Sequence, residues 1–301
     1  FLGESDYDQV IRVQENTAIY KPNMRVDGKH EPLAYIVTNA YDDNDEIRNT
    51  LASIEDSSRM RANCSGPIDP LEMKAKGLIE GVDYKLRTPN SYLTKKKNGE
   101  WGMIAYANEI NSVMIGYKRG RFTGEIGASG WCNDNPEKFK TLSKISYWNE
   151  KAFATADPET YGKQKGFAET FIEKRYRVGG GSFTTLSANR YHSGQSARMS
   201  AHVDSGDTEM GLTTMCVFRS GEYDGAFLTF PRYGVAIDAP DNSVVIADSL
   251  QIHGVTPITG KGERFSCVAY CDNRLATLGS RARTPKPIGK YAKPNTLEEF
   301  F

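Results

Sequence analysis

The sequence predicts an α+β protein with a double-stranded β-helix (jelly-roll or cupin-like) core and helices packed against it. Two patterns predict this class. Short apolar runs alternate with turns between residues 182 and 271, as in a double-sheet antiparallel barrel. Upstream, residues 135–177 carry apolar residues at helical spacing. The expected core strands are Ser182–Arg190, Leu212–Phe218, Ala226–Phe230, Val235–Asp238, Ser243–Ala247 and Phe265–Cys271.

The length of 301 residues fits one large domain with a sizeable core. We expect a single domain in three parts. Residues 1–178 form a mixed helical and hairpin extension, residues 179–275 the jelly-roll core, and residues 276–301 a basic, proline-containing tail. The first thirty residues are polar and mixed, which suggests an irregular arm on the surface.

Within the extension, turn and cap residues mark the elements. A short strand is expected at Leu33–Thr38, followed by a helix that buries Ile47, Leu51 and Ile54. Asn98-Gly99 predicts a hairpin between residues 92 and 101. Two helices are expected to begin at Asn135-Pro136 and at Asp157-Pro158, because proline is favoured at the first helical position. The run Gly179–Gly181 is interpreted as a flexible hinge at the entry to the core.

The composition excludes few classes of function, but it limits how the protein could bind nucleic acid or a membrane. The 38 basic and 38 acidic residues balance, so binding to nucleic acid would need a local basic patch. No apolar run is long enough to span a membrane, and we expect neither a membrane partner nor a secretory leader. The five cysteines have no paired spacing and indicate reduced thiols in an intracellular protein.

The strongest chemical signal is His202-x-Asp204, followed by His253 and then by Arg264-x-Ser266. This is the ligand order of a 2-His-1-carboxylate triad, which leaves open positions on Fe(II). Residues two apart on a strand share a face, so one metal can take both His202 and Asp204. The chain has only four histidines. The alternative is a structural pair of histidines.

Arg264 and Ser266 also share a strand face. A guanidinium with a neighbouring hydroxyl suits the distal carboxylate of a dicarboxylic acid such as 2-oxoglutarate. Thr256 is a second candidate for the hydroxyl. The expected cosubstrate site is therefore Arg264 with Ser266 or Thr256.

These motifs carry a family resemblance. The segments His202–Asp207, Gly211–Phe218, Gly225–Phe230, Tyr233–Asp238, Asn242–Asp248 and His253–Pro257 resemble the catalytic core of the TET/J-binding-protein group of Fe(II) dioxygenases. Those enzymes oxidise the methyl group of 5-methylcytosine or thymine in nucleic acid. The resemblance covers roughly residues 180 to 275. It implies that His202, Asp204 and His253 bind iron and that Arg264 binds 2-oxoglutarate.

The same group includes green-algal members that use ascorbate as cosubstrate. The resemblance therefore implies 2-oxoglutarate or ascorbate, together with O2. Asp207 is an extra acid just beyond the H-x-D motif. It is a candidate catalytic residue that could change which cosubstrate the site accepts.

Two basic or polar segments are candidates for substrate binding. Residues 189–195 are expected to form a loop over the mouth of the site, where Asn189, Tyr191 and His192 could read or stack on a base. Arg119 and Arg121 alternate with aromatic residues in the segment 117–122, which suits contact with a nucleic-acid backbone. The alternatives are a free surface histidine and a basic edge strand that resists aggregation.

The sequence hypothesis is an Fe(II)-dependent dioxygenase that oxidises or modifies the methyl group of 5-methylcytosine, or of thymine, in DNA. Its partner would be DNA that contains methylated bases, with no obligate protein partner, and its location would be nuclear. One alternative is a 2-oxoglutarate-dependent hydroxylase of a small molecule or protein side chain, because a fold does not specify a substrate. Another is a non-enzymatic barrel that binds nucleic acid and carries a vestigial metal site.

Overall fold

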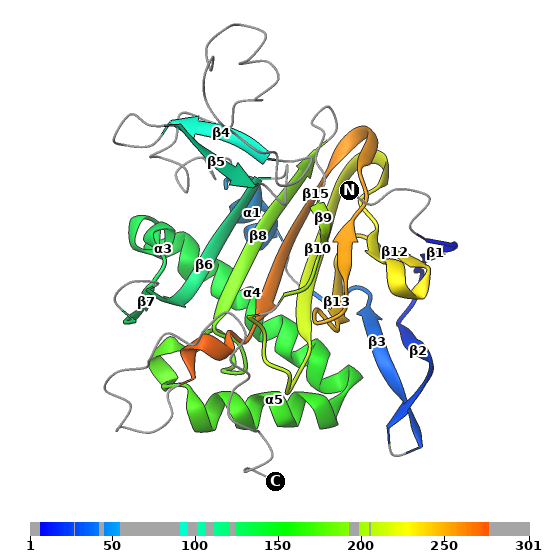
Figure 1. The fold of residues 1–301 in the computed structure, drawn as a ribbon, viewed down its shortest axis with the longest axis horizontal. Coiled ribbons are helices and arrows are strands. Elements are labelled where there is room, and N and C mark those ends of the chain that lie inside the picture. Colours follow the sequence, from blue (N-terminus) through cyan, green and yellow to red (C-terminus); the bar gives the residue numbers. More distant parts are fainter. Residues whose placement is uncertain are drawn as a thin grey trace, which may run out of the picture.

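The computed structural model describes residues 7–26, 28–41, 45–54, 91–95, 101–105, 111–120, 124–192, 199–204 and 206–276. Two β-sheets dominate this part of the chain, and helices cover one face of the larger sheet (Figure 1). The expected α+β class with a double-stranded β-helix core is confirmed.

The larger sheet has eight strands in the order β2-β3-β13-β10-β15-β8-β6-β7. Neighbouring strands in this larger sheet are antiparallel. The strands of the larger sheet are β2 Thr17–Val26, β3 Lys29–Val37, β6 Asn111–Arg119, β7 Ile126–Ala128, β8 Thr185–His192, β10 Thr213–Gly225, β13 Ser243–Ala247 and β15 Ile258–Tyr270.

The smaller sheet has five strands in the order β1-β12-β11-β14-β9, of which β1 and β12 are parallel. Its strands are β1 Gln9–Arg12, β9 Met199–His202, β11 Leu228–Phe230, β12 Val235–Asp238 and β14 His253–Val255. A separate pair, β4 Ser91–Lys95 and β5 Trp101–Ala105, forms the expected hairpin. Its connecting residues 96–100 lie outside the described residues.

The two-residue period of the central strands separates two cores. In β10, Cys216 and Phe218 belong to the core under the helices, whereas Met215 and Val217 belong to the core between the two sheets. Successive strand residues point to opposite faces, so one apolar run supplies both cores. The second core also takes Phe230 from the smaller sheet. The space between the sheets is therefore the interior of the barrel.

The helices cover the outer face of the larger sheet. Their bounds are α1 Asp45–Ala52, α3 Gly130–Asp134, α4 Pro136–Ala156 and α5 Pro158–Phe171, with short 3-10 turns η3 Lys174–Tyr176, η4 Pro231–Tyr233 and η5 Asn273–Leu275. Both predicted prolines occupy the first turn of their helices, and Asp157 caps α5 through the Thr160 amide. Ile47, Leu51 and Ile54 are buried as expected.

The expectation of an irregular N-terminal arm is wrong. Residues 9–12 add β1 beside β12, and residues 17–26 add β2 beside β3 in the larger sheet. These segments lack a long apolar run because each lies at or near a sheet edge. Edge strands make part of their backbone hydrogen bonds to solvent and need fewer buried side chains. The barrel sheets consequently take strands from well before residue 179.

The expectation of a flexible hinge at Gly179–Gly181 is also wrong. Gly179 adopts φ +59° and lies against helix α4, where an added Cβ would come within 2.7 Å of the Tyr147 amide nitrogen. The Gly180 position is similarly filled by the Glu150 carboxylate. The glycines therefore allow a tight turn to pack on the helix. An isolated bridge between Val178 and Phe183 closes this turn.

Three smaller expectations have clear outcomes. The cysteines at positions 132, 216, 267 and 271 are all free, as predicted for reduced thiols; Cys64 lies outside the described residues. Strand β15 begins at Ile258 rather than Phe265, because the outer half of β10 pairs with it up to Gly225. Among the described helices, none has the length and apolar character needed to cross a membrane. The basic tail after residue 276 lies outside the described residues.

Candidate active site

Three side chains that could bind a metal ion meet where β9 and β14 pair. His202 ends β9, Asp204 follows two residues later, and His253 begins β14 directly opposite His202 in the register. The His202 Nε2 atom lies 3.5 Å from Asp204 Oδ1, and the His253 Nε2 atom lies 3.7 Å from Asp204 Oδ2. All three potential ligand atoms lie within 4.8 Å of one another. One metal ion can therefore contact all three.

Neighbouring backbone groups fix this arrangement. The His253 Nδ1 atom lies 2.9 Å from the Gln251 carbonyl oxygen, which directs Nε2 toward Asp204. The Asp204 amide donates to the Ser249 carbonyl at 3.0 Å. Burial, and next the nearby His202 ring, lower the pKa of His253. A neutral imidazole oriented through its second nitrogen is the form that binds metal.

The triad lines a cavity of about 400 Å³ inside the barrel. One wall comes from β8, β10, β13 and β15 of the larger sheet, and the other from β11 and β14 of the smaller sheet. Phe230 and Val255 form part of the apolar lining, while Asn189 and Ser249 supply polar groups. The volume falls in the range of small-molecule sites. The cavity is therefore large enough for a small substrate group beside a metal.

Arg264 and Ser266 face the barrel interior from β15. They lie opposite Tyr191 and Asn189 of β8, and Val268 on the same face lines the cavity. Arg264 is 3% exposed; its guanidinium carbon lies 5.3 Å from the centre of the Tyr191 ring.

Two polar atoms of this pair lack partners. Among the described residues, neither Arg264 Nη1 nor Ser266 Oγ, both buried, has a hydrogen-bond partner. The other amino group of Arg264 donates to the Met215 sulfur at 3.5 Å. Leaving a buried polar group unpaired costs about 1–3 kcal/mol, and more for a charged one. The donor set therefore fits an anionic ligand such as a carboxylate.

Thr256 occupies a different place from the one expected. Its hydroxyl accepts the Phe227 amide at 2.9 Å, and its own amide donates to the Phe227 carbonyl at 3.1 Å. It is buried and does not belong to the described lining of the cavity. Thr256 thus ties the segment after β14 to Phe227, just before β11, and Ser266 is the hydroxyl that accompanies Arg264.

Asp207 is a second carboxylic acid in the cavity wall. It is buried and accepts hydrogen bonds from the hydroxyls of Thr213 and Ser249, the latter at 2.6 Å. Burial, followed by the nearby charge of Asp204, raises the pKa of Asp207 to about 7. Unlike an ordinary aspartate, this side chain changes protonation state near neutral pH.

Asn189 and Tyr191 line the cavity, as proposed, but not from a loop. Both lie in β8, two residues apart, so their side chains share the inner face of the sheet. The expected loop over the mouth is wrong for residues 189–192, because pairing with β15 continues to His192. The side chain of His192 lies outside the described part of the structure.

Arg119 has a structural position. Its Nε donates to the Arg274 carbonyl at 2.6 Å and its Nη1 to the Gly124 carbonyl at 3.0 Å. It does not line the described cavity, although it holds a residue that does. Arg121 lies outside the described residues.

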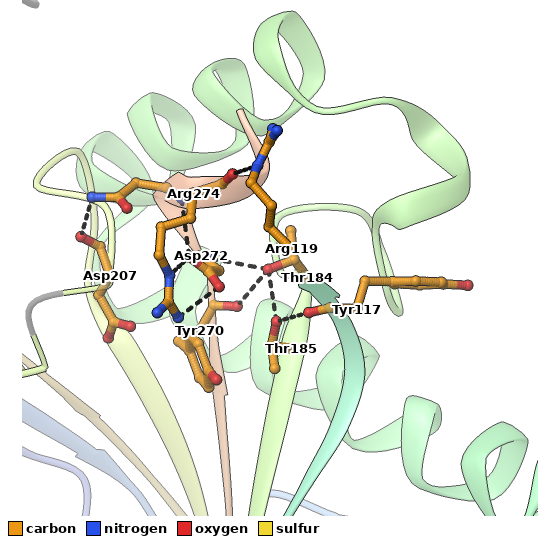
Figure 2. A network of polar contacts seen from close by, with 9 residues as sticks. Tyr117, Arg119, Thr184, Thr185, Asp207, Tyr270, Asp272 and Arg274 are labelled. Carbon is orange, nitrogen blue, oxygen red and sulfur yellow. Dashed lines mark hydrogen bonds and ion pairs between the residues drawn. The ribbon is translucent and has the colours of Figure 1, made fainter. Parts of the chain in front are cut away.

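Sequence reasoning missed Arg274, whose side chain lines the cavity. Its guanidinium pairs with both oxygens of Asp272, at 2.7 and 2.8 Å (Figure 2). No motif marks this residue, since it follows the last core strand in a polar stretch. The available sequence signal was an acid and an arginine two residues apart, just after the strand that carries Arg264.

Comparison with known proteins agrees with this geometry. Residues 134–273 match the Tet_JBP family model, described as the oxygenase domain of the 2OGFeDO superfamily. The fold and the site thus fit an oxygenase domain of that superfamily. Within it, the matched residues are similar to the Tet_JBP family, which confirms the resemblance seen in the sequence.

The similar proteins include two from Trypanosoma brucei brucei. Thymine dioxygenase JBP1 is 31% identical over 168 residues, which cover 53% of this chain and 19% of that protein. Bifunctional helicase and thymine dioxygenase JBP2 is 26% identical over 206 residues, covering 65% and 17% respectively. This chain therefore spans less than one fifth of either relative.

A solved structure of NgTET1 in complex with 5mC DNA has a similar fold. The TM-score is 0.52 at 11% sequence identity, with 89% of this chain and 84% of that chain covered. At this identity the likeness concerns the fold. It supports the double-stranded β-helix architecture derived from the strand order.

Proposed function

We propose that this chain is an Fe(II)-dependent dioxygenase that oxidises the methyl group of 5-methylcytosine, or of thymine, in DNA. The observation that carries the proposal is one cavity lined by His202, Asp204 and His253. Arg264 Nη1 and Ser266 Oγ, which lack a hydrogen-bond partner among the described residues, belong to side chains that face the same barrel interior. The match of residues 134–273 to the Tet_JBP family model supports the reaction class. The thymine dioxygenases of Trypanosoma brucei brucei support a methylated pyrimidine as substrate.

The donor set fits iron. Two imidazoles and one carboxylate that leave positions open are typical of non-haem Fe(II) oxygenases. In this proposal His202, Asp204 and His253 hold the metal. When bound, the iron supplies the oxidising chemistry with O2 and the cosubstrate. Burial lowers the pKa of His253 and favours its neutral form, and the Gln251 carbonyl orients the ring.

The cosubstrate we propose is 2-oxoglutarate. Its distal carboxylate would accept from Arg264 Nη1 and Ser266 Oγ, which gives both buried groups a partner. Such a charge-assisted pair is strong where water is excluded. The Tyr191 ring against the guanidinium keeps that group in place.

The substrate base would enter the remaining cavity. A base within a duplex must leave the stack to reach it, which costs a few kcal/mol. Apolar contact with Phe230 and Val255 and hydrogen bonding to Asn189 would offset that cost. We assign Asp207, the second carboxyl of the cavity, to bind a polar group of the substrate or cosubstrate. A DNA substrate also leads us to propose a nuclear location.

The test is a reaction of the purified chain with DNA. The chain is loaded with Fe(II) without oxygen and mixed with duplex DNA that contains 5-methylcytosine or thymine. Air and 2-oxoglutarate are then added, and nucleosides are analysed by mass spectrometry. We expect loss of the methylated base and release of succinate. An unchanged base with continued 2-oxoglutarate turnover would instead favour a small-molecule or protein hydroxylase.

Two controls sharpen the assay. His202→Ala should abolish turnover, whereas His30→Ala, an exposed histidine on β3, should not change it. A parallel reaction contains ascorbate in place of 2-oxoglutarate. Base modification with ascorbate alone would replace the cosubstrate in this proposal and keep the iron site. Full activity of His202→Ala would overturn the ligand assignment.

A further inference from the structure

We propose that Arg274 binds a backbone phosphate of the nucleic-acid strand whose base enters the cavity. This inference rests on the proposed function, because it assumes a nucleotide substrate. It assigns to the known cavity a contact that neither the triad motif nor the Arg264 motif contains. Four observations carry it: the place of Arg274, its exposure, the way it is held, and the charges around it.

Arg274 lies on the cavity wall near the proposed metal ligands. It is the only arginine or lysine among the described residues that line the cavity. A Cβ added to Gly206, two residues after Asp204, would lie 3.0 Å from its Nη2. Its side chain is 59% exposed, in contrast to the buried Arg264. Arg264 is thus placed for a small enclosed anion, and Arg274 for an anion that remains outside.

The guanidinium is fixed before any ligand binds. Asp272 accepts from its Nε and Nη2, which leaves the Nη1 amino group for a second acceptor. Arg119 holds the Arg274 carbonyl, and the Thr184 hydroxyl accepts the Asp272 amide at 2.9 Å (Figure 2). A side chain already fixed loses little conformational entropy when it binds.

The surrounding charge explains why a cation is needed. Asp204 and Asp207 both line the cavity, and Asp204, together with Asp207 when it is ionised, would repel a phosphate that approaches. A guanidinium offers a planar fork that fits phosphate oxygens. Phosphate contacts of this kind set the position of the strand and carry no sequence information. Arg274 would therefore position the nucleotide, whichever base is chosen.

The test measures how DNA binding depends on salt. Fluorescence anisotropy under anaerobic conditions gives the affinity of the full chain for a labelled 5-methylcytosine duplex at several salt concentrations. Loss of one phosphate contact lowers the slope of log affinity against log salt by about 0.9. We expect this decrease for Arg274→Gln, together with a uniform loss of affinity across sequences. Affinity for 2-oxoglutarate should not change.

Arg175→Gln is the matched control. Arg175 also pairs with an acid two residues earlier, Glu173, at 2.9 Å, and is 68% exposed, but it does not line the described cavity. Its slope should equal that of the unaltered chain. Because Arg274→Gln leaves the buried Asp272 without a cation, the double change Asp272→Asn with Arg274→Gln is measured too. This neutral pair should fold and show the same lower slope.

The outcomes separate this inference from the proposed function. The role of Arg274 would be overturned if the double variant kept the unaltered slope of log DNA affinity against log salt. It would also be overturned if the variants bound 2-oxoglutarate more weakly and DNA equally well. Either result would count even if methylated DNA is oxidised. A lower slope without any base oxidation would support the phosphate contact and refute the proposed reaction. No binding of the unaltered chain to DNA would refute both.

Discussion

Replacement of Lys21 by methionine should weaken both the fold and the iron site. Lys21 comes from β2, yet it is 2% exposed and forms ion pairs with Asp248, at 2.7 Å, and with Glu31. Burial lowers the pKa of Lys21, but bonds to the two carboxylates outweigh this and leave the pKa above its ordinary value. The ammonium is therefore charged and forms ion pairs with two carboxylates.

The ion pair reaches His253, a proposed metal ligand, through a short chain of bonds. The same Asp248 oxygen that pairs with Lys21 accepts from Gln251 Nε2 at 2.9 Å. Tyr233 donates to the Gln251 side chain at 2.7 Å, and the Gln251 carbonyl lies beside His253 Nδ1. Lys21 is thus a positioning residue for the loop that orients His253.

The magnitude follows from the exposure of the carboxylates. Breaking a fully buried ion pair by removing one partner costs about 3–5 kcal/mol. Here Asp248 is 13% exposed and Glu31 is 29% exposed, so water reaches both after the change. We therefore expect Lys21→Met to lower the free energy of unfolding by about 2–3 kcal/mol. Iron affinity should fall by up to about tenfold, since supporting contacts contribute about 10–100-fold.

The assay combines urea unfolding of the metal-free chain with anaerobic Fe(II) titration. The double variant Lys21→Met with Asp248→Asn should recover part of the lost stability, because it removes one of the two unpaired charges. Lys163→Met is the control; this exposed residue pairs with Glu159 one helical turn earlier, and the effect should stay within about 0.5 kcal/mol. Equal effects of Lys21→Met and Lys163→Met would refute the reasoning.

Two further predictions concern the site and the glycine turn. The folded-state pKa of Asp207 is raised to about 7, so the native chain holds a proton that the unfolded chain releases near pH 4. The free energy of unfolding should therefore fall as pH rises from about 4 to about 7. Asp207→Asn should flatten this dependence in urea unfolding of the metal-free chain; an unchanged dependence would assign it to other groups. Gly179→Ala should lower the melting temperature, because it combines φ +59° with a close approach to Tyr147, whereas Gly162→Ala, with open space around it, should not.

The local chemistry of the core was predictable from sequence. The spacing His202-x-Asp204 identified the residues that come together, because a strand end places residues two apart on one side. Arg264 and Ser266 share a face for the same reason. Asn135-Pro136 and Asp157-Pro158 began helices because their preferences are local. Each of these predictions depends on only a few neighbouring residues.

Contacts between distant segments were not predictable. No sequence pattern indicated that β1 and β2 join the barrel sheets, since edge strands need little apolar surface. It placed Asn189 and Tyr191 in a loop, because their polar neighbours hide the pairing with β15. It also treated Gly179 as a hinge, although helix α4 fills the space around it.

The sequence by itself determined the ligand types, their order along the chain and the strand pattern of the barrel. The tertiary structure decided which groups share the cavity: it brought Arg274 to the wall and turned Thr256 and Arg119 away to backbone carbonyls and amides. The physical reason is that side-chain periodicity is set by adjacent residues. A cavity, by contrast, is formed by strands whose pairing depends on the register of the whole sheet.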